Sequence, residues 1–178
     1  MQSNWDKSFE LVMQSEGGFS DDQRDHGNHM PDGRPGCTNL GVTMMTWEIY
    51  CQRQATIDEM KSLTKDDVKP LYKKLFWDKV WGDRMPNGLD YLLFDFAVNS
   101  GVGRAVMTLQ SVVGTTQDGG MGPITYAATV TTNPVWLIEQ YSDAKEKFYK
   151  GLDNFNVYGT GWLNRVDHVE NVAKTMVA

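Results

Sequence analysis

The first sixteen residues combine a helical apolar stripe with a carboxylic acid at its end. The stripe consists of apolar side chains that recur at helical spacing: Trp5, Phe9, Val12 and Met13. At roughly 100° per residue, Glu16 falls within the same narrow arc. Gly17 and Gly18 follow, and paired glycines are typical of a helix end because they adopt left-handed conformations without a steric penalty. The sequence therefore predicts a helix that buries one face and ends at an acid.

Glu16 is suited to general acid catalysis at the end of this stripe. Partial burial disfavours a carboxylate anion and raises its pKa, so that a proton is available near neutral pH. The alternative is a surface glutamate in the last helical turn, which is the ordinary position of this residue type. A glutamate there opposes the helix dipole and is a poor choice for stability alone. This conflict favours a functional role for Glu16.

Several short blocks follow one another along the chain. The first three are Glu16–Phe19 (EGGF), Asp25–Asn28 (DHGN) and Thr38–Thr43 (TNLGVT). The later blocks are Phe76–Asp78, Phe94–Gly101, Leu109–Gln110, Asp118–Gly119, Gly122–Pro123 with Thr125, and Gly161–Val166. In this order they resemble family 108 of the glycoside hydrolases, which are phage-type muramidases whose opening blocks are usually written EGGY, DPGG and TNYGIT.

One segment departs from that family pattern. The family runs from the DPGG block to the threonine within a few residues, whereas here residues 29–37 (HMPDGRPGC) separate Asn28 from Thr38. Its prolines and glycines suit a loop excursion. We therefore expect the insertion to loop out and to leave Thr38 in the position that the family implies.

The resemblance implies a catalytic set of Glu16, Asp25 and Thr38. Glu16 is the expected general acid, while Asp25, in a polar and better solvated loop, is expected to stay ionised. Together with Thr38, Asp25 would position a water for attack on the opposite face, which gives inversion. The alternative is nucleophilic attack or direct stabilisation by Asp25, with retention. The distance between the two carboxylates decides between them, and the sequence does not contain it.

Two further residues are candidates for substrate binding. Leu89 to Asn99 is apolar nearly all round, which predicts a central buried helix whose polar exceptions are Asp95 and Asn99. One interpretation is that both tie this helix to neighbouring loops. The other is that Asn99 faces the substrate cleft and binds sugar acetamide groups. Gln110, in the Leu109–Gln110 block, is the second candidate.

The fold class expected is mainly α, lysozyme-like and two-lobed, with a small β-hairpin near the active site between Phe19 and Val42. With 178 residues, 40% of them hydrophobic, the chain has the size of one domain with a good core. We expect a single lysozyme-like domain over 1–178. Within it, residues 1–88 form the catalytic part with the EGG motif and residues 89–178 the helical peptidoglycan-binding part.

Charge and hydropathy limit the partners. The net charge is −6 and no run of Lys or Arg occurs, so nucleic-acid binding through phosphate contacts is not expected. No stretch approaches the roughly 20 apolar residues of a membrane span, and the N-terminus MQSNWDKSFE lacks a basic region followed by an apolar one. We expect a monomer made in the host cytoplasm that acts on the cell wall after release, for example through a holin.

Metal and cofactor sites are not predicted. Cys37 and Cys51 are the only cysteines, and two thiols are expected in a cytosolic product, the alternative being a disulfide between the insertion and the next helix. His26, His29 and these cysteines offer four ligands, but their spacing matches no zinc signature. Glycosidic hydrolysis by carboxyl groups requires neither a metal nor a cofactor.

The function expected is therefore that of a bacteriolytic N-acetylmuramidase. It would cleave the β-1,4 bond between N-acetylmuramic acid and N-acetylglucosamine in bacterial peptidoglycan, as a phage endolysin does during host lysis. A lytic transglycosylase would also use one acid, but Asp25 argues against it. A non-catalytic wall-binding or tail structural protein would need only the fold, and the intact set of Glu16, Asp25 and Thr38 argues against that.

Overall fold

The structure, a computed structural model, describes residues 3–177. The described chain divides into two compact units, one formed by Phe9–Lys74 and the other by residues 3–8 together with residues 75–177. Helix α1 (Trp5–Met13) and the π-helical turn η2 (Lys73–Trp77) contain the two boundaries. The prediction of one domain with a functional boundary at residue 88 stays a prediction.

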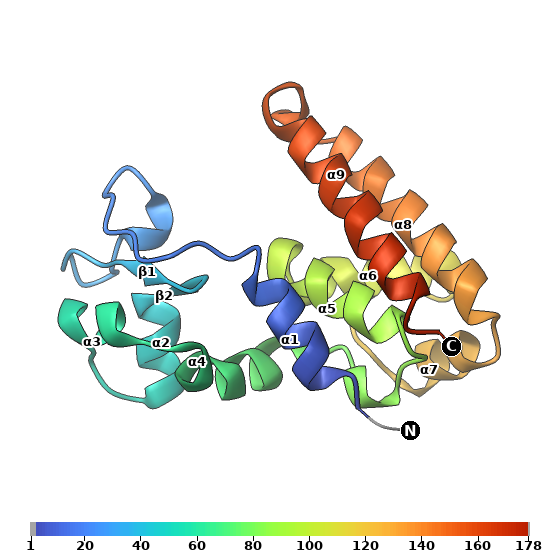
Figure 1. Cartoon of the computed structure of the whole chain (residues 1–178), viewed down its shortest axis with the longest axis horizontal. Coiled ribbons are helices and arrows are strands. Elements are labelled where there is room, and N and C mark those ends of the chain that lie inside the picture. The colour runs from blue at the N-terminus through green and yellow to red at the C-terminus, as the bar shows by residue number, and fades with distance from the viewer. Residues whose placement is uncertain (1–2, 178) are drawn as a thin grey trace. The chain divides into compact units, whose positions relative to one another are not determined.

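The Phe9–Lys74 unit consists of short elements around a hairpin (Figure 1). Its elements are η1 (His26–Asn28), β1 (Thr38–Asn39), β2 (Val42–Thr43), α2 (Met44–Cys51), α3 (Ile57–Ser62) and α4 (Lys65–Tyr72). The strands are antiparallel, with Thr38 opposite Thr43. Three threonines cap the helices: Thr43, Thr56 and Thr64 each accept a hydrogen bond from a backbone amide three residues on.

The other unit is helical (Figure 1). Its elements are η3 (Gly82–Arg84), α5 (Leu89–Ser100), α6 (Val102–Val113), α7 (Pro123–Val130), α8 (Pro134–Lys150) and α9 (Phe155–Lys174). Helix α5 is buried along most of its length and contacts α6, α8 and α9, which confirms the predicted central helix. The long helices α8 and α9 lie side by side. The structure is thus mainly α with one small antiparallel hairpin, as predicted.

Asp95 on α5 holds the helical unit together from inside. Its carboxylate accepts hydrogen bonds from Lys145 Nζ on α8 at 2.5 Å and from Arg165 Nη2 on α9 at 2.6 Å. The Asp95 and Lys145 side chains are each 1% exposed. Burial alone would raise the pKa of Asp95, but the two cations outweigh this effect and hold it below the usual value. Asp95 therefore ties α5 to two helices, rather than to the neighbouring loops that the sequence suggested.

Helix α1 is shorter than its sequence pattern indicates. The apolar stripe is buried as predicted, with Phe9 and Val12 at most 1% exposed. The helix ends at Met13, however, and Ser15 N donates to Val12 O in a tight turn. Ser15 and the following glycines are weak helix formers, which explains the early end. Glu16 consequently lies at a bend beyond the helix and is not the last member of its stripe.

Candidate active site

Glu16 is half-buried and lies against the turn of the β1–β2 hairpin. That turn contains two residues, Leu40 and Gly41, both in the left-handed region with φ of 49° and 73°. This combination is the one that type I′ hairpin turns require. A Cβ built on Gly41 would overlap Oε2 of Glu16 and the hydroxyl oxygen of Tyr72. The absence of a side chain at position 41 therefore allows the Glu16 carboxyl group to lie against the turn.

Tyr72, at the end of α4, supports the same turn. Its hydroxyl donates to the carbonyl oxygen of Leu40 at 2.9 Å, and its ring packs edge-on against Phe9. Burial, with a smaller contribution from the charge of Glu16, raises the pKa of Tyr72 well above its usual value. Tyr72 is therefore neutral at physiological pH, and its hydroxyl proton is directed at Leu40.

Asp25 and Thr38 are connected through Asn28, which is fully buried. The Asn28 backbone amide donates to the carbonyl oxygen of Asp25 at 3.0 Å, and the Thr38 hydroxyl donates to Oδ1 of Asn28 at 2.8 Å. The Asn28 side-chain amide donates to Asp22 O, which fixes its orientation. Because the Thr38 proton is engaged by Asn28, the oxygen of Thr38 is left to accept a hydrogen bond, for example from a water.

The Asp25 side chain is exposed and caps η1, where its Oδ1 accepts a hydrogen bond from the Gly27 amide at 2.9 Å. This local bond fixes the carboxylate in a solvated loop. The segment that joins Glu16 to this loop is also fixed, since Ser20 and Thr38 exchange two backbone hydrogen bonds of 2.8 Å. Glu16, Asp25 and Thr38 are thus all attached to one small hairpin in one compact unit.

The insertion at residues 29–37 is closed at its base. His29 and Pro35 form an isolated bridge, and the Gly36 amide donates to the carbonyl oxygen of Asn28 at 2.9 Å. The chain therefore leaves and returns next to Asn28, and Thr38 still pairs with Ser20 and with Thr43 across the hairpin. An insertion that leaves and returns next to Asn28 in this way can loop out without moving Thr38 away from the hairpin.

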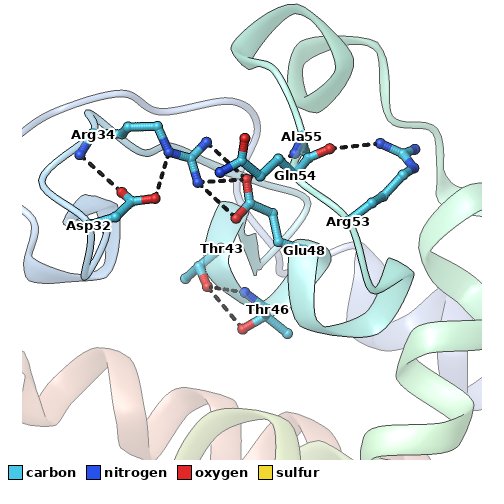
Figure 2. A network of polar contacts seen from close by, with 8 residues as sticks. All are labelled: Asp32, Arg34, Thr43, Thr46, Glu48, Arg53, Gln54 and Ala55. Atoms are coloured by element: carbon cyan, nitrogen blue, oxygen red, sulfur yellow. Dashed lines mark hydrogen bonds and ion pairs between the residues drawn. The ribbon is translucent and has the colours of Figure 1, made fainter.

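The tip of the insertion is attached to α2 by a charged network (Figure 2). Arg34 donates to Asp32 and, through both terminal nitrogens, to Glu48 at 3.0–3.1 Å. Glu48 also accepts a hydrogen bond from the Ala55 amide at 2.9 Å. The Arg34 guanidinium and the Ala55 amide hold the pKa of Glu48 below its usual value. A cavity of about 390 Å³ lies beside this tip, lined by Gln23, His29, Met30, Gly33, Arg34 and Pro35.

The two candidate substrate-binding residues belong to the helical unit. Asn99 is exposed, and its side-chain amide donates to the carbonyl oxygen of Asp95 within α5 at 2.6 Å. Gln110 is 1% exposed and holds the loop before α7: it donates to Asp118 and Gly120 and accepts from the Gly119 amide. The contacts of Gln110 are thus those of a structural residue. Substrate binding by either residue stays a prediction.

The cysteines and histidines do not converge on one point. Cys37 is a buried thiol and Cys51 a partly exposed one, as predicted, and burial raises the pKa of the Cys37 thiol. The rings of His26 and His29 meet edge to face at 5.5 Å. Within residues 3–177, no three His, Cys, Asp or Glu side chains are arranged to hold a metal ion. In the same range, no helix has the length and apolar character needed to cross a membrane.

Three residues at the site were not singled out as functional from the sequence. Asn28 and Gly41 lie inside quoted blocks, but nothing in those blocks indicates that Asn28 binds Thr38 or that Gly41 meets Glu16. Tyr72 has the spacing of a core residue in α4, and this spacing by itself indicates packing rather than function. Its contact with Leu40 joins positions 32 residues apart. Local spacing contains no signal for such a contact.

Comparisons with known proteins agree with the geometry. The family described as Glycosyl hydrolase 108 matches residues 9–101. No curated protein matches the chain. Among solved structures, the chain is similar to the one titled "Structure of Brucella abortus SagA", with 36% sequence identity, a TM-score of 0.83, and coverage of 98% of this chain and 95% of that chain. These similarities support the lysozyme-like fold class and a peptidoglycan-degrading activity. The chain therefore belongs to glycosyl hydrolase family 108, and it is a glycoside hydrolase.

Proposed function

We propose that the protein is an N-acetylmuramidase that hydrolyses the β-1,4 bond between N-acetylmuramic acid and N-acetylglucosamine in bacterial peptidoglycan. One observation carries the proposal: a half-buried carboxyl group, Glu16, lies against the turn of the hairpin that contains Thr38, and Asn28 links Thr38 to Asp25. An acid together with a separate carboxylate is the pair of groups that hydrolysis of a glycosidic bond requires, and a hydroxyl beside them can hold the attacking water.

Glu16 acts in this proposal as the general acid that protonates the leaving glycosidic oxygen. Asp25 is exposed and fixed by the Gly27 amide, which suits a carboxylate that accepts a proton from water. Thr38 accepts the second hydrogen bond of that water, since its own proton is donated to Asn28. Attack by this water from the opposite face of the sugar gives inversion of the anomeric centre.

The helical unit contributes to substrate binding in this proposal. Asn99 is exposed close to the end of α5 and presents an amide group that is suited to sugar acetamides. Gln110 acts through the loop at Asp118–Gly120, which it holds by its side-chain hydrogen bonds.

The biological role proposed is that of a phage endolysin in host lysis. The protein would be made in the host cytoplasm as a monomer and would act on the wall after release, for example through a holin. The order of sequence blocks that resembles the phage-type muramidases supports this proposal.

Mass spectrometry of the soluble products from purified peptidoglycan tests the activity directly. Reducing ends of hydrated muramic acid are the expected result, and proton NMR of the fresh products should show the inverted anomer first. The retained anomer would assign Asp25 as a nucleophile. Anhydro-muramic ends would mean a lytic transglycosylase, and an absence of sugar products would mean a wall-binding or tail structural protein.

A further inference from the structure

Tyr72 and the Leu40–Gly41 turn form an arrangement that the proposed function does not yet use. Tyr72 is 1% exposed, and its hydroxyl donates a hydrogen bond to the carbonyl oxygen of Leu40. Leu40 has a φ of 49°, which is uncommon for a residue with a branched aliphatic side chain. A strained backbone of this kind persists only where the surrounding structure holds it, and such positions cluster at active sites.

The strained turn meets the candidate acid. Oε2 of Glu16 and the hydroxyl oxygen of Tyr72 both occupy the space that a side chain on Gly41 would fill, so these two oxygens are neighbours. The Tyr72 hydroxyl donates to the carbonyl oxygen of Leu40, so the turn holds the Tyr72 oxygen in place beside the carboxyl group of Glu16.

We propose that Tyr72 and Gly41 are positioning residues for the Glu16 carboxyl group. Tyr72 fixes the turn through Leu40 and places its hydroxyl oxygen beside the carboxyl group. Gly41 leaves open the space in which the carboxyl group lies. This inference rests on the proposed function, because it assigns the two residues to the step in which Glu16 gives its proton to the leaving oxygen.

The orientation of a general acid affects the rate of the chemical step more than substrate binding. Proton donation by a positioned side chain contributes roughly 10²- to 10⁴-fold to a rate, and a displacement of about 1 Å can remove 10²-fold. Tyr72→Phe keeps the buried ring but removes both the bond to Leu40 and the hydroxyl oxygen beside Glu16. We expect kcat to fall about tenfold or more while KM stays near the wild-type value.

Tyr141→Phe is a matched control for this variant. Tyr141 is also fully buried, and its hydroxyl donates to a backbone carbonyl, that of Ala105, at 3.0 Å. It belongs to the helical unit and has no part in the proposed catalytic set. Both substitutions remove one buried bond of the same kind and should lower the melting temperature similarly. Only Tyr72→Phe should lower kcat on a soluble glycan oligomer.

Gly41→Ala and Gly114→Ala form a second matched pair. The two glycines have nearly the same φ, 73° and 72°, so alanine imposes a similar backbone strain at each. Around Gly114 no atom lies within 4 Å of the added carbon, whereas at Gly41 that carbon displaces the Glu16 carboxyl group and Tyr72. Gly41→Ala should therefore lose most of its kcat, and Gly114→Ala should keep the wild-type value, both measured at a temperature where each variant is fully folded.

A substrate with a different leaving group distinguishes two causes of a lower kcat: a misplaced acid and general damage to the site. An aryl glycoside of the same oligomer has a leaving group that departs without protonation. If Tyr72 and Gly41 act through Glu16, the loss in kcat of their variants should be much smaller on the aryl glycoside than on the natural bond. An equal loss on both substrates would assign the two residues to the fold of the hairpin and overturn the inference.

These outcomes are distinct from a failure of the proposed function. A wild-type protein that releases no sugar from peptidoglycan would refute the function itself. An active wild type with an inactive Glu16→Gln variant would uphold the function. If kcat of Tyr72→Phe then equalled that of the wild type, the inference alone would fall.

Discussion

The hydroxyl of Thr38 donates to the buried side-chain oxygen of Asn28 at 2.8 Å, which makes Asn28 the link between Thr38 and the Asp25 loop. The direction of this bond decides what Thr38 can offer to a ligand. Its proton points into the protein, and its oxygen can accept a hydrogen bond from a water. The proposed position of the water depends on this direction of the hydrogen bond between Thr38 and Asn28.

Thr38→Val and Thr38→Ser test that bond. Valine has nearly the shape of threonine but leaves the buried oxygen of Asn28 without its donor, which costs about 1–3 kcal/mol of stability. It also removes the acceptor for the water, so kcat should fall. Serine keeps the hydroxyl and should keep most of the activity. Equal activity of the two variants, measured on peptidoglycan at matched fractions of folded protein, would remove Thr38 from the site.

Glu16→Gln should abolish cleavage at nearly unchanged melting temperature, because the amide keeps the shape of the side chain but cannot donate an acidic proton. The expected loss in kcat is roughly 10²- to 10⁴-fold. Glu10→Gln is the control, since Glu10 is an exposed residue of α1 whose ion pair with Lys65 lies on the surface. A Glu16→Gln variant as active as the Glu10→Gln variant would show that another group donates the proton.

Asp25→Asn should lose most of the activity at constant stability. The amide oxygen of asparagine can still accept the hydrogen bond from Gly27, so the cap of η1 survives while the negative charge is lost. Asp21→Asn removes one charge from the same loop and should have little effect. A mild effect of Asp25→Asn on the rate of wall lysis would assign the activation of water to a different group.

The core of the helical unit should be sensitive to the loss of one charge. Asp95→Asn leaves the Lys145 ammonium group buried without its counter-charge, which should cost about 3–5 kcal/mol of unfolding free energy. Glu146→Gln breaks the exposed pair with Lys150 and should change the stability by about 0.5 kcal/mol or less. Urea unfolding of both variants measures the difference. A change below about 1 kcal/mol for Asp95→Asn would mean that water reaches Lys145.

The acid stability of the protein should depend on Glu59. The Arg53 guanidinium and the Trp47 indole donate to this carboxylate and lower its pKa from 4.5 to about 2. A lowered pKa in the folded state means that the contribution to stability is present above pH 4.5 and is lost as the pH falls toward 2. The unfolding free energy of the wild type should fall more steeply over this range than that of Glu59→Gln. Parallel curves in acid titrations would contradict this.

The sequence predicted the parts of the site that depend on local pattern. The buried face of α1 and the central helix α5 follow from the spacing of apolar residues, and the block order pointed to Glu16, Asp25 and Thr38. The helix was predicted to end at Glu16, but it ends at Met13 because the weak helix formers after it prevail over the apolar period.

What the sequence could not supply are contacts between distant positions. Glu16, Gly41 and Tyr72 meet through the turn of the hairpin, and each looks ordinary in its own segment. The left-handed φ of Leu40 was also not predictable, because leucine has no preference for it. Asp95 was recognised as an exception in an apolar helix, but its partners Lys145 and Arg165 lie 50 and 70 residues further along the chain.

The buried group of Asp95, Lys145 and Arg165 also restricts how this protein can evolve. A first substitution of Asp95 by an apolar residue leaves the Lys145 ammonium group buried without a counter-charge, so this route to an apolar core passes through a less stable intermediate. Lineages of this family should therefore either keep both residues or exchange them together. A protein library that varies Asp95 and Lys145 jointly should contain stable members that no single-site library contains.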